Sequence, residues 1–175
     1  MKKLLVHTCC APCATVPVDR LKAIYDLTLF YGNPNIEPEE EWKKRLHDLK
    51  RFAEQYDVEL IPEAYNNSDW QTDIAGLEQE PEGGKRCRSC FEHRLRMTAE
   101  LAASGFDCFT TTLTVSPHKN TKTIFEIATR VAAEYETVFL ETDFKKNNGF
   151  QQSVAMSREY NMYRQNYCGC LYSKP

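Results

Sequence analysis

Lys3-Leu4-Leu5-Val6-His7-Thr8 decides the fold, because this apolar run leads without a break into Cys9-Cys10-Ala11-Pro12-Cys13. The run predicts a short buried strand over residues 3–8. Apolar residues at helical spacing predict a helix over residues 17–25. The three cysteines therefore fall in a turn between a strand and a helix, and parallel α/β proteins bind their ligands at such turns.

The rest of the chain repeats this alternation. Further strands are predicted at residues 27–31, 58–64, 108–115 and 137–140, and further helices at 38–56, 87–104, 118–135 and 149–163. Residues 65–86 show no period and predict a functional loop or lid. Strands separated by helices imply right-handed crossovers. We therefore expect one α/β domain over residues 1–175, with a doubly wound, mostly parallel, Rossmann-like sheet of about five strands and helices on both faces.

Composition limits the class of protein. Of the 175 residues, 42% are apolar and 27% are charged, which is typical of a soluble globular chain. The apolar run at the start is too short for a signal peptide or a membrane span, so we expect a cytoplasmic protein without a membrane partner. The net charge of −3 gives no global basic field, and contact with RNA would depend on local clusters such as Lys85, Arg86 and Arg88.

Eight cysteines are the strongest chemical signal, since thiols at this density in a reducing compartment usually bind metal or carry out redox chemistry. Cys9-Cys10-Ala11-Pro12-Cys13 and Cys87-Arg88-Ser89-Cys90 each contain a Cys-x-x-Cys step, which lets two thiolates converge on one metal centre. Spacing pairs Cys10 with Cys13. Both a zinc ion and a four-iron cluster take four thiolates, and the spacing taken alone favours structural zinc.

Cys168-Gly169-Cys170 predicts a redox-active cysteine pair. A disulfide across one residue closes a small strained ring, which makes it easily reduced and suited to electron transfer. The alternative is that both cysteines are further metal ligands. Cys108 stands alone at the start of an apolar strand and is expected to lie in the core.

Six motifs together resemble the cobalamin-independent epoxyqueuosine reductases, and the resemblance covers essentially the whole chain. The motifs are His7 to Cys13, Tyr31-Gly32-Asn33-Pro34-Asn35-Ile36, Arg86-Cys87-Arg88-Ser89-Cys90, Thr110-Thr111-Thr112-Leu113, Ser116-Pro117-His118-Lys119 and Tyr163 to Cys170. The resemblance implies a fold similar to that of adenine-nucleotide alpha-hydrolases, with cysteines in place of the phosphate loop.

The activity that the resemblance implies is that of an oxidoreductase in tRNA processing, at the last step of queuosine biosynthesis. Epoxyqueuosine at the anticodon wobble position of tRNA would lose its oxygen in a two-electron reduction, giving queuosine and water. The partners would be tRNA carrying epoxyqueuosine and an external electron donor.

The same resemblance implies the cofactors. A [4Fe-4S] cluster would be bound by four cysteines, namely Cys9, Cys10, Cys87 and Cys90. Cys13 would then be the candidate for a second, mononuclear metal ion such as iron, or for a site that faces the substrate. Cys168 and Cys170 would be catalytic and form a redox-active disulfide.

Two other functions stay open at this point. A zinc-stabilised RNA-binding module would use the same cysteines without redox chemistry. A nucleotide-modifying sulfurtransferase would need an ATP-binding loop, and the chain contains neither Gly-x-Gly-x-x-Gly nor Gly-x-x-x-x-Gly-Lys.

Overall fold

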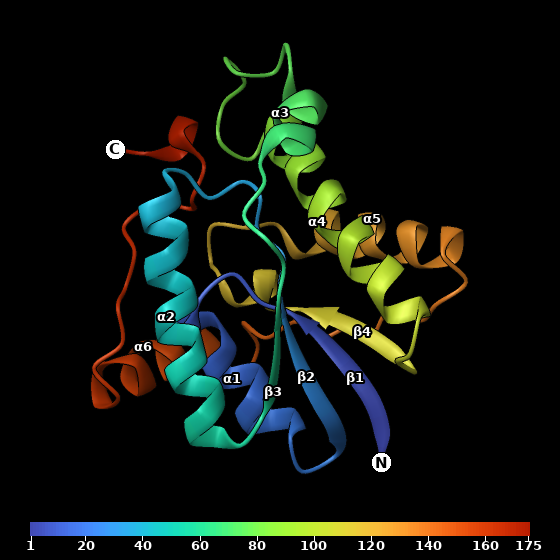
Figure 1. Ribbon diagram of the computed structural model, residues 1–175, viewed down its shortest axis with the longest axis vertical. Coiled ribbons are helices and arrows are strands. Elements are labelled where there is room, and N and C mark those ends of the chain that lie inside the picture. The colour runs from blue at the N-terminus through green and yellow to red at the C-terminus, as the bar shows by residue number, and fades with distance from the viewer.

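Strand β1 (Lys2–His7) lies inside a parallel sheet of four strands, in the order β3-β2-β1-β4, in the computed structural model of residues 1–175 (Figure 1). It pairs with β2 (Tyr25–Tyr31) on one side and with β4 (Cys108–Thr111) on the other. β3 (Glu59–Pro62) extends the sheet beyond β2. The predicted α/β class with a doubly wound parallel sheet is confirmed.

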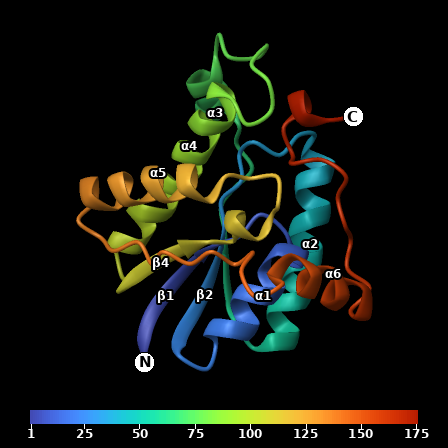
Figure 2. The ribbon, with the colours of Figure 1, turned by 180° about the vertical axis from the view of Figure 1, so that it is seen from behind.

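Helices cover both faces of the sheet (Figures 1 and 2). They are α1 (Ala11–Leu21), α2 (Glu39–Tyr56), α3 (Ser68–Ile74), α4 (Lys85–Ala103), α5 (Thr121–Glu134) and α6 (Gly149–Glu159). The views place α1, α2 and α6 on one side and α4 and α5 on the other. None of the helices combines the length and the apolar character that a membrane span requires.

The alternation of side chains along β1 builds two separate cores. Leu4 and Val6 pack with residues of α1 and α2, whereas Leu5 packs with residues of α4 and α5. All three side chains are fully buried. The strand therefore has consecutive apolar residues rather than alternating apolar and polar ones, because helices cover it on both faces.

The fifth strand predicted at residues 137–140 does not extend the sheet. Residues 137–140 form only one bridge, between Phe109 and Phe139. Backbone hydrogen bonds join Phe109 to Val138 and Leu140, but the Thr110 hydroxyl then donates to the carbonyl of Leu140. A side chain thus takes the acceptor that a longer ladder would need, and the sheet ends at four strands.

Other boundaries differ for local reasons. α1 already begins at Ala11, because Pro12 is compatible with the first turn of a helix. β4 stops at Thr111, whose hydroxyl accepts a hydrogen bond from Leu113 N and opens the 3₁₀ turn η1 (Thr112–Val115). The expected loop at 65–86 contains α3, and the last helix ends at Glu159.

Leu5→Ala should lower the free energy of unfolding by about 2–5 kcal/mol, because it opens a cavity in the core under α4 and α5. Urea denaturation measures the change. Ile24→Ala is the matched control, since Ile24 is 60% exposed and should shift stability by less than about 0.5 kcal/mol. Equal effects of the two substitutions would contradict the central position of β1.

Candidate functional site

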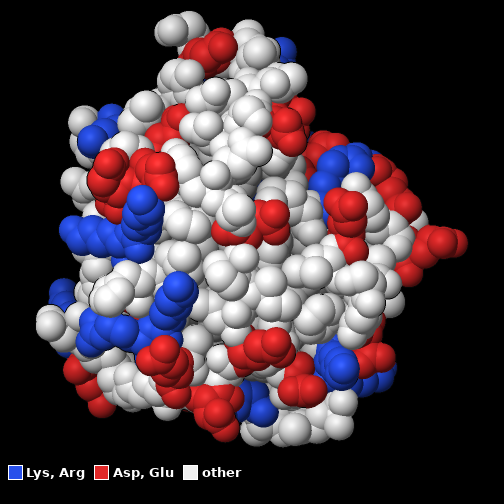
Figure 3. Space-filling view, viewed as in Figure 1, with Lys and Arg blue, Asp and Glu red and all other residues white.

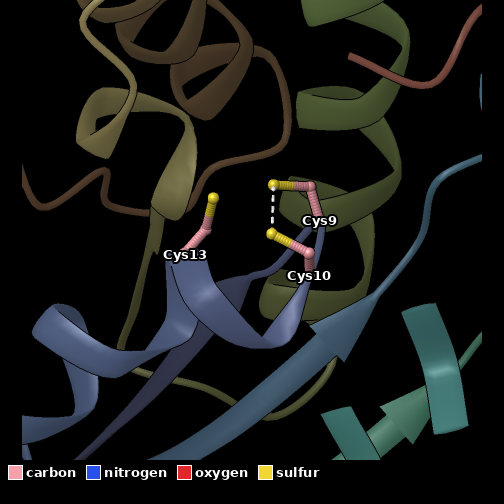
Figure 4. A group of neighbouring side chains, drawn as sticks. All are labelled: Cys9, Cys10 and Cys13. Carbon is pink, nitrogen blue, oxygen red and sulfur yellow. Dashed lines mark hydrogen bonds between the residues drawn. The ribbon is translucent and has the colours of Figure 1, made fainter. Parts of the chain in front are cut away.

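Cys9, Cys10 and Cys13 converge where β1 ends and α1 begins (Figure 4). Cys10 is the N-cap residue of α1, and Cys13 lies in the first turn of that helix. The three Sγ atoms all lie within 4.8 Å of one another, and those of Cys9 and Cys10 are 3.9 Å apart. Two thiolates on one tetrahedral ion with bonds of about 2.3 Å are about 3.8 Å apart. This triad therefore fits a single metal ion.

The three thiols of the triad differ in their pKa values. Hydrogen bonds from Cys10 and Cys13 hold the pKa of Cys9 well below its usual range. Hydrogen bonding to Cys10 and Cys9, together with burial, raises the pKa of Cys13 well above its usual range. Gln165, from the C-terminal segment, donates a hydrogen bond to Cys10 Sγ at 3.1 Å. The lowered pKa thus falls on Cys9 and the raised ones on Cys10 and Cys13, and metal binding would displace the protons that those two hold.

A second group of four thiols lies beside the first. Cys87, Cys90, Cys168 and Cys170 line a small cavity of about 20 Å³. Burial raises the pKa of Cys87, and it raises that of Cys90 to about 11. All eight cysteines of the chain are free thiols.

A larger cavity of about 380 Å³ joins the two groups, because Cys9 and Cys13 from the triad and Cys168 from the second group all line it. Its walls also include the cations Lys119 and Arg164 and the aromatic rings of Phe150 and Tyr167. Burial alone would lower the pKa of Lys119, but Cys168 and Cys9 nearby raise it. A cavity of this volume is in the range of small-molecule sites.

The surroundings of the sulfurs fit an anionic metal centre. Arg94 and Asn35 line the small cavity and are 1% exposed each, yet Arg94 Nη2 and Asn35 Nδ2 have no hydrogen-bond partner in the protein. Buried donors without a partner cost free energy, and sulfur of a thiolate-bound cluster would satisfy them.

His7 donates to or accepts from Thr111 Oγ1 through Nδ1 at 2.9 Å, and burial lowers its pKa to about 4.

Helix α2 holds the C-terminal cysteine pair in place. The buried guanidinium of Arg45 donates from Nη1 to the carbonyl of Cys168 at 2.9 Å and from Nη2 to that of Tyr167 at 3.1 Å. Its Nε donates to Glu41 Oε1 at 2.8 Å. On the other side, the carbonyl of Gly169 accepts from Glu37 N at 2.9 Å. The backbone on both sides of Cys168 is therefore fixed.

Gly169 is required at the turn between the two cysteines. Its φ is +136°, a conformation that other residues rarely adopt. A Cβ atom at this position would lie 2.8 Å from Ile36 Cγ1 and 3.4 Å from Arg45 Nη1. The close approach of the backbone to Arg45 thus depends on glycine.

Comparison with known proteins decides the family. The family model described as epoxyqueuosine reductase QueH matches residues 4–175. The chain belongs to the QueH family.

Curated QueH proteins align with nearly all of the chain. Epoxyqueuosine reductase QueH of Streptococcus pyogenes serotype M1 is 42% identical over 97% of this chain and 69% of its own length. The protein of the same name from Staphylococcus epidermidis is 37% identical over 98% of this chain and 76% of its own length. That from Thermotoga maritima is 34% identical over 99% and 91%.

The seven thiols predicted to act lie in two groups at this site, and their assignment to a QueH cofactor stays a prediction. Cys9, Cys10 and Cys13 are together, while Cys87 and Cys90 share a cavity with the terminal pair. Cys108 is buried in the core, as expected.

Two cations of the site, Arg45 and Arg94, were not predicted from the sequence. Arg45 lies among the apolar positions Trp42, Leu46 and Leu49 of α2, all of them buried. A charged residue on the apolar face of an amphipathic helix was the available signal, because such a charge needs a partner in the interior.

Zinc titration of the metal-free, reduced protein tests the triad. Binding should release protons from Cys10 and Cys13, so affinity should rise with pH above neutrality. Cys13→Ser should release about one proton fewer, measured with an indicator dye. Cys108→Ala should match the wild type, and an unchanged proton count in Cys13→Ser would exclude Cys13 as a ligand.

Arg45→Met should free the C-terminal segment and raise the alkylation rate of the buried Cys170 by about tenfold, the effect of losing about 1.4 kcal/mol of anchoring. Mass spectrometry of the reduced protein measures the rate. Lys43→Met is the control on the same helix, because Lys43 is exposed and pairs only with Glu39. A rate in Arg45→Met equal to that of the control would show that Arg45 does not hold the segment.

Proposed function

We propose that this chain is an oxidoreductase that converts epoxyqueuosine to queuosine in tRNA, with the large cavity as its active site. The observation that carries the proposal is the meeting of sulfur and positive charge in one cavity, where Cys9, Cys13 and Cys168 lie with Arg94 and Lys119. Membership of the QueH family supplies the substrate, because the curated relatives are named for epoxyqueuosine reduction.

The reaction requires two electrons and two protons. The carbon–oxygen bonds of the epoxide break, an alkene forms, and the oxygen leaves as water. The dithiol of Cys168 and Cys170 can supply both electrons and both protons by closing to a disulfide, which an external donor then reduces. Cys168 lines both cavities, so it can face the substrate while its partner stays in the small cavity.

The proposed cofactor is a [4Fe-4S] cluster on Cys9, Cys10, Cys87 and Cys90, with Cys13 as a ligand of a second metal ion such as iron. Such a cluster would supply single electrons. The unpartnered donors of Arg94 and Asn35 support an anionic cofactor beside Cys90.

The wobble base is the part of the tRNA that would bind in the cavity. A base that reacts must leave the stack and enter a pocket, and Phe150 and Tyr167 provide aromatic walls there. Figure 3 shows Lys and Arg side chains gathered on the left of the face drawn, mixed with acidic ones. Phosphate contacts would therefore be local, as the net charge of −3 requires. A chain with eight cysteines fits a reducing compartment, and we propose that the reaction takes place in the cytoplasm.

Zinc-stabilised RNA binding is the second candidate, and the 3.9 Å between Cys9 Sγ and Cys10 Sγ favours it, because that is the spacing of two ligands on one ion. Such a protein would bind tRNA without consuming a reductant. Turnover therefore separates the two candidates.

Cys168→Ser should lower the conversion of epoxyqueuosine in tRNA by at least about a hundredfold, because it removes one of the reacting thiols. Nucleoside mass spectrometry measures the loss of one oxygen atom under anaerobic conditions with a chemical reductant. Cys108→Ala is the control, since Cys108 lies in the core and should leave turnover unchanged. Full activity of Cys168→Ser would reject the thiol mechanism, and no turnover by the wild type would favour RNA binding alone.

A further inference from the structure

Glu82 is the single carboxylate on the wall of the large cavity. The other charged side chains of that wall, Arg94, Lys119 and Arg164, are cations. Glu82 also lines the small cavity, where it lies with Cys168 and the other thiols of the second group. One carboxylate thus lies at the end of the large cavity that is next to these sulfurs.

The segment between α3 and α4 holds the backbone of Glu82 in this position. The buried guanidinium of Arg86 donates a hydrogen bond to the carbonyl of Glu80. Gly84 N donates to the carbonyl of Pro81 at 2.9 Å and closes a turn around Glu82. The backbone on both sides of Glu82 is therefore held by hydrogen bonds within the chain.

The carboxylate of Glu82 has no partner in the protein, whereas the two glutamates before it have one. Glu78 Oε1 accepts a hydrogen bond from Gly76 N at 3.1 Å, and Glu80 Oε2 accepts one from Lys85 N at 3.2 Å. Glu82 makes no hydrogen bond or ion pair with its side chain, although cations line the same cavity. Its side chain is exposed, so its carboxylate is available to a ligand.

A carboxylate in this position fits a ligand that carries an ammonium group. Epoxyqueuosine has such a group, because a secondary amine joins its base to the ring that carries the epoxide. An alkyl amine is protonated near neutral pH, as the amine of lysine is. The cations of the cavity repel an ammonium group, so the wall at Glu82 is the favourable one for it.

We infer that Glu82 binds the protonated secondary amine of epoxyqueuosine and gives the cavity its preference for a cationic wobble base. This inference rests on the proposed function, which supplies the substrate. The ring carbon that bears the nitrogen is also bonded to the epoxide. Because Cys168 lines both cavities together with Glu82, an amine bound at Glu82 holds the epoxide beside that thiol.

Two RNA probes that differ in one charge test the inference. Each is an anticodon stem–loop, with either 7-aminomethyl-7-deazaguanine or 7-cyano-7-deazaguanine at the wobble position. The aminomethyl group is protonated, and the cyano group is neutral. Fluorescence anisotropy with the anaerobically purified full chain should show that the wild type binds the aminomethyl RNA about tenfold more tightly, the effect of one charge-assisted hydrogen bond.

Glu82→Gln should bind the two RNAs about equally, because it removes the charge and keeps the shape. Its affinity for the cyano RNA should equal that of the wild type, whereas a merely structural role of Glu82 would weaken the binding of both RNAs alike. Glu80→Gln is the matched control from the same segment. It should keep the preference, because the Glu80 carboxylate binds Lys85 N.

Equal affinities of the wild type for the two RNAs, or no binding of the aminomethyl RNA, would overturn the inference. A preference kept in Glu82→Gln would also overturn it, and so would an equal loss of affinity for both RNAs. The binding measurement needs no turnover. A wild type that shows the preference through Glu82 but does not reduce epoxyqueuosine would therefore count against the proposed function and leave the amine site intact.

Discussion

The convergence of parallel strand ends on one edge of the sheet is the constraint on which this site depends. β1 runs into the cysteine triad, and β4 runs into η1, from which Thr112 Oγ1 lies 3.7 Å from Cys9 Sγ. Because the neighbouring strands are parallel, every loop that follows a strand emerges at this edge. The N-terminal end of α4 and the C-terminal segment complete it. Cys9 and Cys168, more than 150 residues apart in sequence, thus line one cavity without any covalent link.

Gathering thiols in the interior has an electrostatic consequence. A buried thiolate is unfavourable unless a cation or a donor lies near it. That charge comes from Arg45 in α2, Arg94 in α4 and Lys119 in the turn before α5, and each of the three has a different role. Arg45 fixes the backbone of the terminal pair, Arg94 lies between the two sulfur groups, and Lys119 lines the large cavity. The positive charge therefore positions the sulfurs as well as stabilising them.

Local pattern predicted much of this architecture. The apolar run at residues 3–8 and the cysteines after it correctly predicted the strand and the edge of the sheet at which the site lies. A strand that is buried on both faces needs apolar side chains at consecutive positions, and this pattern is visible in the sequence. What local pattern could not supply was contact between distant side chains. The hydroxyl of Thr110 ends the sheet before a fifth strand forms. Arg45 reaches a carbonyl 123 residues away, and the partition of the thiols into two groups depends on where the C-terminal segment folds back.

Iron and sulfide analysis of the anaerobically purified full chain tests most directly the claim that these sulfurs form a redox centre. We expect about four irons and four acid-labile sulfides per chain, with any further iron at Cys13, and an absorption that bleaches with dithionite. Stoichiometric zinc without sulfide, reproduced after anaerobic reconstitution with iron and sulfide, would contradict it. The thiols would then be a structural site, and the cavity between them would not be the place of an electron transfer.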